Sequence, residues 1–235
     1  MPVRDRLRKR LMARAGLEYP TGLEQRVVDV GGRPRTYAFA PAGKVPGPLL
    51  VALHGGGGTG LGMAALTDLA ERGPASGFTV AFPDGEGGVW NDDRDAPRLA
   101  RRKGIDDVGF LRTMVEELVN EHVARTGALF VTGISNGAFL SEYLARQASL
   151  PVVGIAPVAG TGTESSRHAA PTPRQPTRVV AFAGTADPLV PYDGGPIGPL
   201  GRVAQRRAPV RGPSPGRGLA APAETVAAAH SAATV

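Results

Sequence analysis

The sequence predicts an α/β fold: an open, mostly parallel sheet with helices on both faces and an N-terminal antiparallel hairpin. Three observations predict it: continuous apolar runs, helical segments between those runs, and two β-favouring runs joined at Gly31-Gly32. The apolar runs do not alternate with polar residues, which is typical of strands buried on both faces. Strands that alternate with helices in the chain indicate a parallel sheet covered on both sides.

Five apolar runs predict the strands, and two segments predict helices between them. The runs are residues 48–54, 77–85, 128–133, 151–160 and 177–184. Residues 61–73 have helical composition and stop at Gly73-Pro74. From Asp106 to Arg125, apolar residues recur at helical spacing after an acidic start, which suits a helix N-terminus. Sites in such sheets gather at the carboxyl ends of strands, so the residues after each run are the functional candidates.

The chain divides by composition into three parts. Residues 1–20 form a basic segment, residues 21–200 form the α/β domain, and residues 201–235 form an irregular tail. In the tail, 23 of 35 residues are Ala, Gly, Pro or Arg, and no run resembles a buried strand. We expect the last strand of the fold to be missing, as it would be in a truncated or frame-shifted chain.

Composition limits the classes of function. The 235 residues include no cysteine, which excludes disulfides and thiolate metal sites. The charged N-terminus lacks the apolar core of a signal peptide, and no run approaches the roughly 20 apolar residues that span a bilayer. The net charge of +6 lies in basic clusters without a nucleic-acid recognition motif. We expect a cytoplasmic protein with no membrane span and no nucleic-acid partner; the oligomeric state stays open.

The segment Gly-Ile-Ser-Asn-Gly, residues 133–137, stands between a predicted strand and a predicted helix. A nucleophile elbow needs a sharp turn at this place, and small residues two before and two after the serine relieve crowding between strand and helix. Gly133 and Gly137 meet that requirement. The pattern alone is weak because many matches are plain turns, but the flanking strand and helix favour Ser135 as a nucleophile.

A glycine-rich segment, LHGGGGTG at residues 53–60, follows another predicted strand. Glycines let the backbone approach a ligand and turn its N–H groups inward. Beside a serine nucleophile, one such N–H and that of the next residue after the serine form an oxyanion hole, which predicts Gly56 and Asn136. Phosphate binding is the competing interpretation, but the Gly-x-x-x-x-Gly-Lys-Ser/Thr pattern is absent. We expect His54 to hold the shape of this loop through hydrogen bonds.

An acidic candidate follows the run at residues 177–184. Asp187 comes after the serine by a helix, a strand and a second connection, which fits the chain order serine, acid, histidine. Its carboxylate would accept a hydrogen bond from an imidazole. In the alternative interpretation this aspartate caps a turn before Pro188, and Asp193 is the reserve candidate.

Seven blocks of the sequence resemble one family in their order and spacing. They are GGRPRTYAFAPAG, LLVALHGGGG, FPDGEGGVWND, DDVGFLRTMVEEL, FVTGISNGAF, APVAG and GTADPLVPYDGG. Across residues 25–196 this order is similar to that of polyhydroxybutyrate depolymerase-like and feruloyl esterase-like α/β-hydrolases. The resemblance implies an α/β-hydrolase fold and serine esterase chemistry without a metal or cofactor. It matches Ser135 to the nucleophile, Asp187 to the acid, and Gly56 with Asn136 to the oxyanion donors.

Two residues of the third block have open roles. Trp90 and Asn91 lie in a loop after a strand, where they would line the acyl or alcohol pocket. The alternative is that Trp90 packs under that loop. Both interpretations remain at this point.

The sequence departs from the family at the histidine that acts as the general base. The family's histidine lies in a block that reads like Gly-His-x-Trp-Pro, which is absent here. His122 precedes the nucleophile in a predicted helix. His230 alone follows Asp187 and is the first candidate for the base, with His168 in reserve.

The resemblance and the candidate residues together predict a carboxylic ester hydrolase. Its substrates would be small-molecule or oligomeric esters of the short-chain, hydroxyalkanoate or feruloyl type. The alternative is a catalytically silent α/β-hydrolase-like binding protein, because the triad histidine is missing or misplaced.

Overall fold

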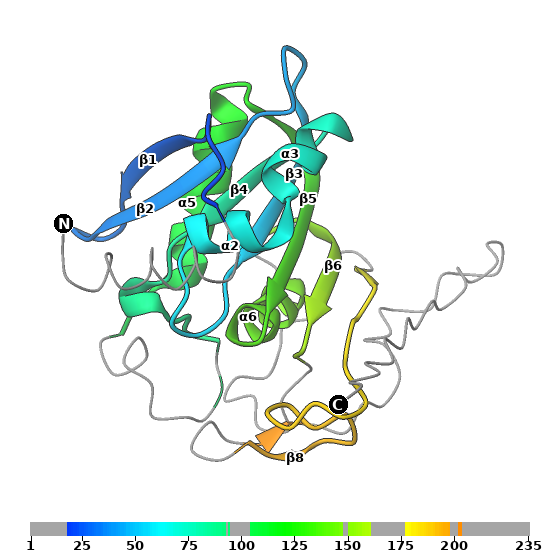
Figure 1. The fold of residues 1–235 in the computed structure, drawn as a ribbon. Coiled ribbons are helices and arrows are strands. Elements are labelled where there is room, and N and C mark those ends of the chain that lie inside the picture. The colour runs from blue at the N-terminus through cyan, green and yellow to red at the C-terminus, as the bar shows by residue number, and fades with distance from the viewer. Residues whose placement is uncertain are drawn as a thin grey trace, which may run out of the picture.

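The computed structural model describes residues 18–92, 94, 104–147, 150–160, 177–197 and 202–203, and a seven-stranded sheet forms its centre (Figure 1). The strands are β1 (Glu24–Asp29), β2 (Pro34–Ala40), β3 (Gly47–Leu53), β4 (Thr79–Pro83), β5 (Ala124–Ile134), β6 (Val152–Val158) and β7 (Arg178–Val179). The helices are α2 (Gly60–Thr67), α3 (Leu69–Ala75), α5 (Asp107–Asn120) and α6 (Asn136–Arg146), with a short 3-10 turn η1 (Glu86–Gly88). The strand order in the sheet is β1-β2-β4-β3-β5-β6-β7.

The strands β1 and β2 form the predicted antiparallel hairpin. Val27 pairs with Thr36, and the turn between the strands carries Gly31 and Gly32, both at positive φ, which glycine adopts without a steric penalty. The strand β2 also pairs antiparallel with β4, whereas every pairing from β4 through to β7 is parallel. The predicted fold class, a mostly parallel open sheet with an antiparallel hairpin at one edge, is therefore confirmed.

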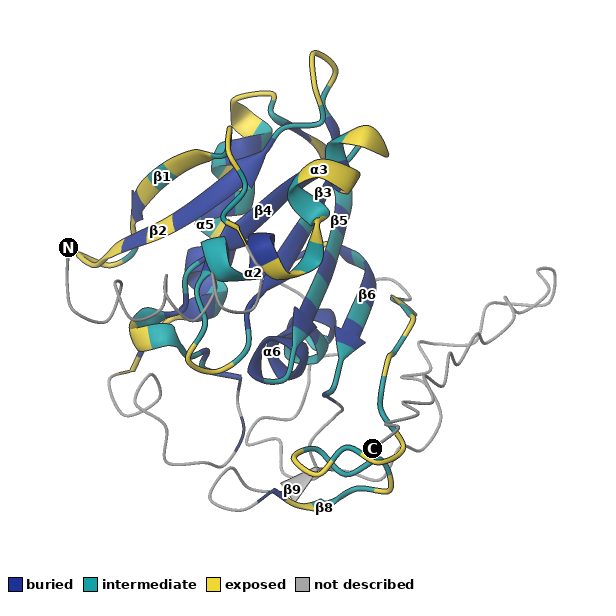
Figure 2. Ribbon diagram, in the orientation of Figure 1, coloured by how far each residue is buried: buried dark blue, intermediate teal, exposed yellow. Residues whose placement is uncertain are grey.

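Two separate layers of side chains cover the sheet. On one face, α5 and α6 pack on Leu49, Val51 and Leu53 of β3, together with strand residues such as Leu129 and Val131 of β5. On the other face, α2 supplies Met63 and Ala64 against Ala52, Val80 and Phe82. Because successive residues of a strand point to opposite faces, β3 contributes to both layers and is almost entirely buried (Figure 2).

Two elements differ from their sequence predictions. The single helix expected over residues 61–73 is interrupted, because Asp68 between α2 and α3 adopts a left-handed conformation (φ 53°, ψ 8°). The run at 177–184 supplies only two residues of regular strand, although Val180 and Phe182 still donate N–H groups to Ile155 and Pro157 of β6. Among the described strands, β7 has a neighbouring strand on one side only, so the backbone groups on its other side face no strand.

A two-residue pairing crosses the boundary predicted at residue 200. The strand β8 (Gly195–Pro196) pairs antiparallel with β9 (Arg202–Val203), apart from the central sheet. The remainder of the predicted tail and the basic segment up to residue 17 lie outside the described residues.

Candidate active site

The turn at Ser135, at the carboxyl edge of the central sheet, has an unusual backbone conformation. Ser135 joins β5 to α6 with φ 51° and ψ −113°, a combination that residues with a Cβ rarely adopt. Its N–H donates to the carbonyl of Val158 at 2.9 Å, and its own carbonyl accepts the N–H of Phe139 at 3.0 Å. The backbone is therefore fixed on both sides, and the half-buried side chain stands at the N-terminus of α6, where the helix dipole favours negative charge.

Glycines make the close approach of α6 to the sheet possible. A Cβ on Gly133 would lie 2.5 Å from the carbonyl carbon and oxygen of Gly137. A Cβ on Gly137 would lie 2.4 Å from the carbonyl oxygen of Leu53 in β3. Both contacts involve backbone atoms, so a side chain at either position would push helix and sheet apart. The two glycines predicted to flank an elbow thus have the packing that an elbow requires.

The glycine-rich loop begins beside this turn. A Cβ on Gly55 would be 3.8 Å from the Cβ of Ser135, so the loop and the elbow are neighbours. Gly57 donates its N–H to the carbonyl of Gly88 at 2.7 Å, and Gly58 donates to Gly55 at 2.9 Å. Among the described residues, no hydrogen bond occupies the N–H of Gly56 or the N–H of Asn136. Neither of the two predicted oxyanion donors is therefore used by a hydrogen bond within the described part of the chain.

His54 shapes this loop. The ring is buried, its Nδ1 lies 2.8 Å from the carbonyl of Gly55, and its Nε2 accepts the N–H of Gly85 at 2.9 Å. These contacts define a neutral imidazole with its proton on Nδ1, because Nε2 acts as the acceptor. Both nitrogens are engaged by backbone groups of the loops, so neither is directed at Ser135.

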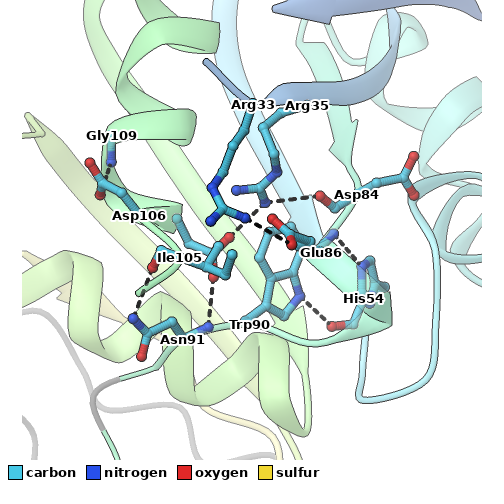
Figure 3. A network of polar contacts seen from close by, with 12 residues as sticks. Arg33, Arg35, His54, Asp84, Glu86, Trp90, Asn91, Ile105, Asp106 and Gly109 are labelled. Atoms are coloured by element: carbon cyan, nitrogen blue, oxygen red, sulfur yellow. Dashed lines mark hydrogen bonds and ion pairs between the residues drawn. The ribbon is translucent and has the colours of Figure 1, made fainter. Parts of the chain in front are cut away.

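Trp90 lies under the loops with no exposed surface. Its indole stacks on His54 with ring centroids 4.7 Å apart, and its Nε1 donates to the carbonyl of His54 at 2.9 Å (Figure 3). The sequence leaves two interpretations of Trp90, lining a pocket or packing under the loop, and its position in the structure is that of a residue packed under the loop. Asn91 is half-buried, and its side-chain amide donates to the carbonyl of Ile105 at 2.9 Å.

A buried ion pair supports the same loop from the other side. Arg35 of β2 and Asp107 at the start of α5 are joined at 2.6 Å, with exposed side-chain fractions of 4% and 0%. The second carboxylate oxygen of Asp107 accepts the N–H of Asn91 at 2.6 Å. Burial raises the pKa of Asp107 above its ordinary value, and the Arg35 guanidinium opposes that rise. In Figure 3 the dashed contacts run from Arg35 toward Asn91.

Asp187 lies at the same edge of the sheet as Ser135. Val158 accepts the N–H of Ser135, and the next residue, Ala159, donates to Phe182, five residues before Asp187. The Asp187 Oδ1 accepts the N–H groups of Leu189 and Val190 at 2.8 and 2.9 Å, so the residue does cap a turn. Among the described residues, no hydrogen bond occupies its Oδ2. Turn capping and a hydrogen bond to an imidazole are therefore compatible.

The loop after Asp187 returns to the first turns of α6. Ile197 is buried against Phe139, with Val190 packed on the same pair. Since Phe139 is four residues after Ser135 in the elbow helix, this contact ties the acid-bearing segment to the serine-bearing element. Asp193, the reserve acid, is exposed.

The histidine of the predicted triad is not among the described residues, because His168 and His230 both fall outside them. The described histidines are His54, whose contacts are given above, and His122. His122 is exposed and precedes β5, so it lies at the edge of the sheet opposite to Ser135.

Two further properties concern the part of the chain that the structure describes. No group of three or more His, Cys, Asp or Glu side chains is arranged there to hold a metal ion. Within the same residues, none of the helices combines the length and apolar character needed to cross a bilayer.

The fold and the site define a class. No protein-family model matches the chain. A solved structure, the acetyl xylan esterase from Aspergillus awamori, superimposes with a TM-score of 0.54 at 17% identity, covering 70% of this chain and 73% of that one. With the strand order and the strained serine turn, this likeness identifies the fold as that of the α/β-hydrolases.

Sequence relatives carry esterase names. The chain is 32% identical over 174 residues to "Putative esterase NocK" of Nocardia uniformis subsp. tsuyamanensis, which covers 72% of this chain and 50% of the relative. It is 28% identical over 131 residues to acetylxylan esterase A of Aspergillus awamori, covering 53% of this chain and 42% of that protein. The chain thus spans about half the length of the curated relatives it matches. Its homologues and structural neighbours are esterases of the α/β-hydrolase type, as the sequence blocks predict.

Proposed function

We propose that the protein hydrolyses carboxylic esters with Ser135 as the nucleophile. The observation that carries this proposal is the backbone of Ser135, held at φ 51° and ψ −113° between β5 and α6. A residue in so sparsely populated a region costs about 1–3 kcal/mol and persists where its surroundings over-determine it, which is characteristic of active sites. The esterase names of the relatives support the same reaction class.

In the proposed reaction, Ser135 Oγ attacks the ester carbonyl carbon and its proton passes to a histidine. Negative charge develops on the carbonyl oxygen, where the N–H groups of Gly56 and Asn136 would hold it. The histidine returns the proton to the departing alcohol, which leaves an acyl group on Ser135. Water then attacks the acyl carbon with the same histidine as base and frees the acid and the serine.

Asp187 is the proposed partner of that histidine. Its Oδ1 is fixed by two backbone N–H groups, which orients the carboxylate and leaves Oδ2 for the imidazole. For the base itself, His230 is the first candidate and His168 the second. Measuring the variants His230→Ala and His168→Ala separately identifies the base: the true one loses turnover by about 10³-fold or more, as triad histidines do.

The proposed substrates are esters with a short acyl chain. Sequence relatives of this chain are named acetylxylan esterases, which favours acetyl groups among the short-chain, hydroxyalkanoate and feruloyl candidates. Turnover of the p-nitrophenyl esters of acetate and butyrate, of a feruloyl ester and of a hydroxybutyrate oligomer would rank the acyl groups. We expect acetate to give the highest kcat/KM.

The test of the proposed function is p-nitrophenyl acetate turnover by the wild type and by Ser135→Ala. We expect Ser135→Ala to lower kcat at least about 10³-fold, because a triad acts as a unit. Ser76→Ala is the matched control, since Ser76 is exposed at the end of α3 and remote from the elbow in the chain. Wild-type turnover no higher than that of Ser135→Ala would instead support a catalytically silent binding protein.

A further inference from the structure

The two proposed oxyanion donors belong to different elements. Gly56 lies in the loop after β3, whereas Asn136 is the first residue of α6. An oxyanion hole functions only if its donors converge on one oxygen at about 2.7–3.1 Å. Whatever fixes the loop after β3 against the start of α6 therefore sets the geometry of the hole. Residues 85–92, here called the bridging loop, contact both sides.

On the side of the glycine-rich loop, the bridging loop makes three hydrogen bonds. Gly85 donates its N–H to His54 Nε2 at 2.9 Å, and Gly88 accepts the N–H of Gly57 at 2.7 Å. The indole Nε1 of Trp90 donates to the carbonyl of His54 at 2.9 Å. These bonds hold the backbone immediately before and after Gly56.

On the side of α6, the bridging loop is held by the side chain of Asn136. The Asn136 Oδ1 accepts the N–H of Trp90 at 2.8 Å, and its Nδ2 donates to the carbonyl of Trp90 at 3.2 Å. The Nδ2 also donates to Asp92 Oδ2 at 2.5 Å. Asn136, Trp90 and Asp92 are all buried, with exposed fractions of 1%, 0% and 7%. The side-chain amide thus pairs with both the N–H and the C=O of Trp90, as a residue of a neighbouring strand would.

A second set of contacts holds Asp92 in place. Its Oδ2 receives two hydrogen bonds from Arg94, at 2.9 and 2.6 Å. The Arg94 guanidinium lies over the ring of Phe139 in α6, 3.8 Å from the centroid. The acceptor that Asn136 uses is therefore itself fixed to the helix that carries Asn136.

We propose that the Asn136 side chain and the Trp90 indole are positioning groups for the oxyanion hole, acting through the bridging loop. Trp90 connects the two sides: its backbone N–H and C=O bind the Asn136 side chain of α6, and its indole binds the glycine-rich loop. Through them the N–H of Asn136 and the N–H of Gly56 keep a fixed separation. The inference rests on the proposed function, because an oxyanion hole has a role only if Ser135 attacks an ester.

The variant Asn136→Ala separates the side chain from the backbone donor. It removes all three side-chain hydrogen bonds and keeps the N–H that would bind the oxyanion. Misplacing a reacting group by about 1 Å can cost about 10²-fold, and loss of a whole donor costs about 10²–10³-fold. We expect kcat to fall about 10- to 100-fold with KM within about twofold of the wild type, because the ground-state ester depends little on the hole.

The experiment measures kcat for p-nitrophenyl acetate per site titrated with a fluorophosphonate, so that misfolded protein does not count. The inhibition constant of a trifluoromethyl ketone, whose serine adduct carries an oxyanion, is measured in parallel. We expect the inhibitor to weaken by the same factor as kcat, which a loss of overall stability would not produce. Asn120→Ala is the matched control, an exposed asparagine at the end of α5, near the opposite edge of the sheet.

Trp90→Phe supplies a second, independent variant. It keeps an aromatic ring beside His54 and removes the Nε1 donor, so we expect a kcat loss of about 10-fold per titrated site. Should Asn136→Ala fail to fold, Trp90→Phe decides the question alone. Values of kcat per titrated site within twofold of the wild type in every variant that folds would overturn the inference while leaving the proposed function intact. A wild type without labelling or turnover would overturn both.

Discussion

The strain at Ser135 predicts an unusual response to glycine. Ser135 adopts φ 51° and ψ −113°, the mirror image of the extended region, which is open to glycine and crowded for any residue with a Cβ. Ser135→Ala and Ser135→Gly both remove the hydroxyl, but only the glycine variant removes the Cβ. The difference in stability between these two variants therefore isolates the backbone strain.

The expected magnitude combines two opposing effects. Relief of the strain contributes about 1–3 kcal/mol, and the greater freedom of glycine in the unfolded chain offsets about 0.4–1 kcal/mol of it. We expect Ser135→Gly to be more stable than Ser135→Ala by about 0.5–2 kcal/mol, with both variants inactive. For a chain of this length, each kcal/mol corresponds to a Tm shift of about 2–4 °C.

The assay is urea unfolding of both variants followed by circular dichroism, with the same pair of substitutions at Ser141 as the control. Ser141 lies inside the same helix, where glycine is less favourable than alanine by about 1 kcal/mol, so the order of stability should reverse. A Ser135→Gly midpoint at or below that of Ser135→Ala would refute the assignment of strain to this turn.

Three further predictions address the elbow, the buried ion pair and the acid. Gly137→Ala places a Cβ 2.4 Å from the Leu53 carbonyl oxygen and should lower the free energy of unfolding by about 1–3 kcal/mol in urea titrations; an unchanged midpoint contradicts the packing. Burial raises the pKa of Asp107 above 3.8, so the folded protein favours the protonated carboxyl. The free energy of unfolding of the wild type, compared with that of Asp107→Asn, should therefore be greatest below pH 3.8 and fall as the pH rises through the raised pKa. Urea unfolding of both proteins at a series of pH values measures this difference. Asp187→Asn should lower kcat by about 10⁴-fold, whereas the exposed Asp193 can become Asn with a change within about twofold; equal losses would remove Asp187 from its role.

Local patterns in the sequence account for most of the fold. The apolar runs predict β3 to β6, because strands buried on both faces are mostly apolar and do not alternate with polar residues, and Gly31-Gly32 predicts the hairpin turn. The break at Asp68 is not visible in the pattern, since aspartate occurs within helices as well as at their ends. The short regular part of β7 depends on what pairs with its outer side, which no local pattern contains.

The candidate site also contains features that local sequence patterns predict and features that they do not. Ser135 and its glycines are recognisable because an elbow places all its requirements within five residues. The contacts of Trp90 cannot be recognised in the sequence, because they join segments that are distant in the chain: His54 is 36 residues away and Asn136 is 46. The Arg35–Asp107 pair, separated by 72 residues, gives no sequence signal at all. The side chain of Asn136 was also missed, because the motif explains that position through its backbone N–H alone.

The claim that Ser135 is the nucleophile is tested most directly by where a fluorophosphonate attaches. The wild-type protein is treated with the reagent, digested, and its peptides are mapped by mass spectrometry. We expect a single adduct on Ser135, no adduct in Ser135→Ala, and unchanged labelling in the Ser76→Ala control. An adduct on another residue, or labelling that survives in Ser135→Ala while ester is still hydrolysed, would contradict it.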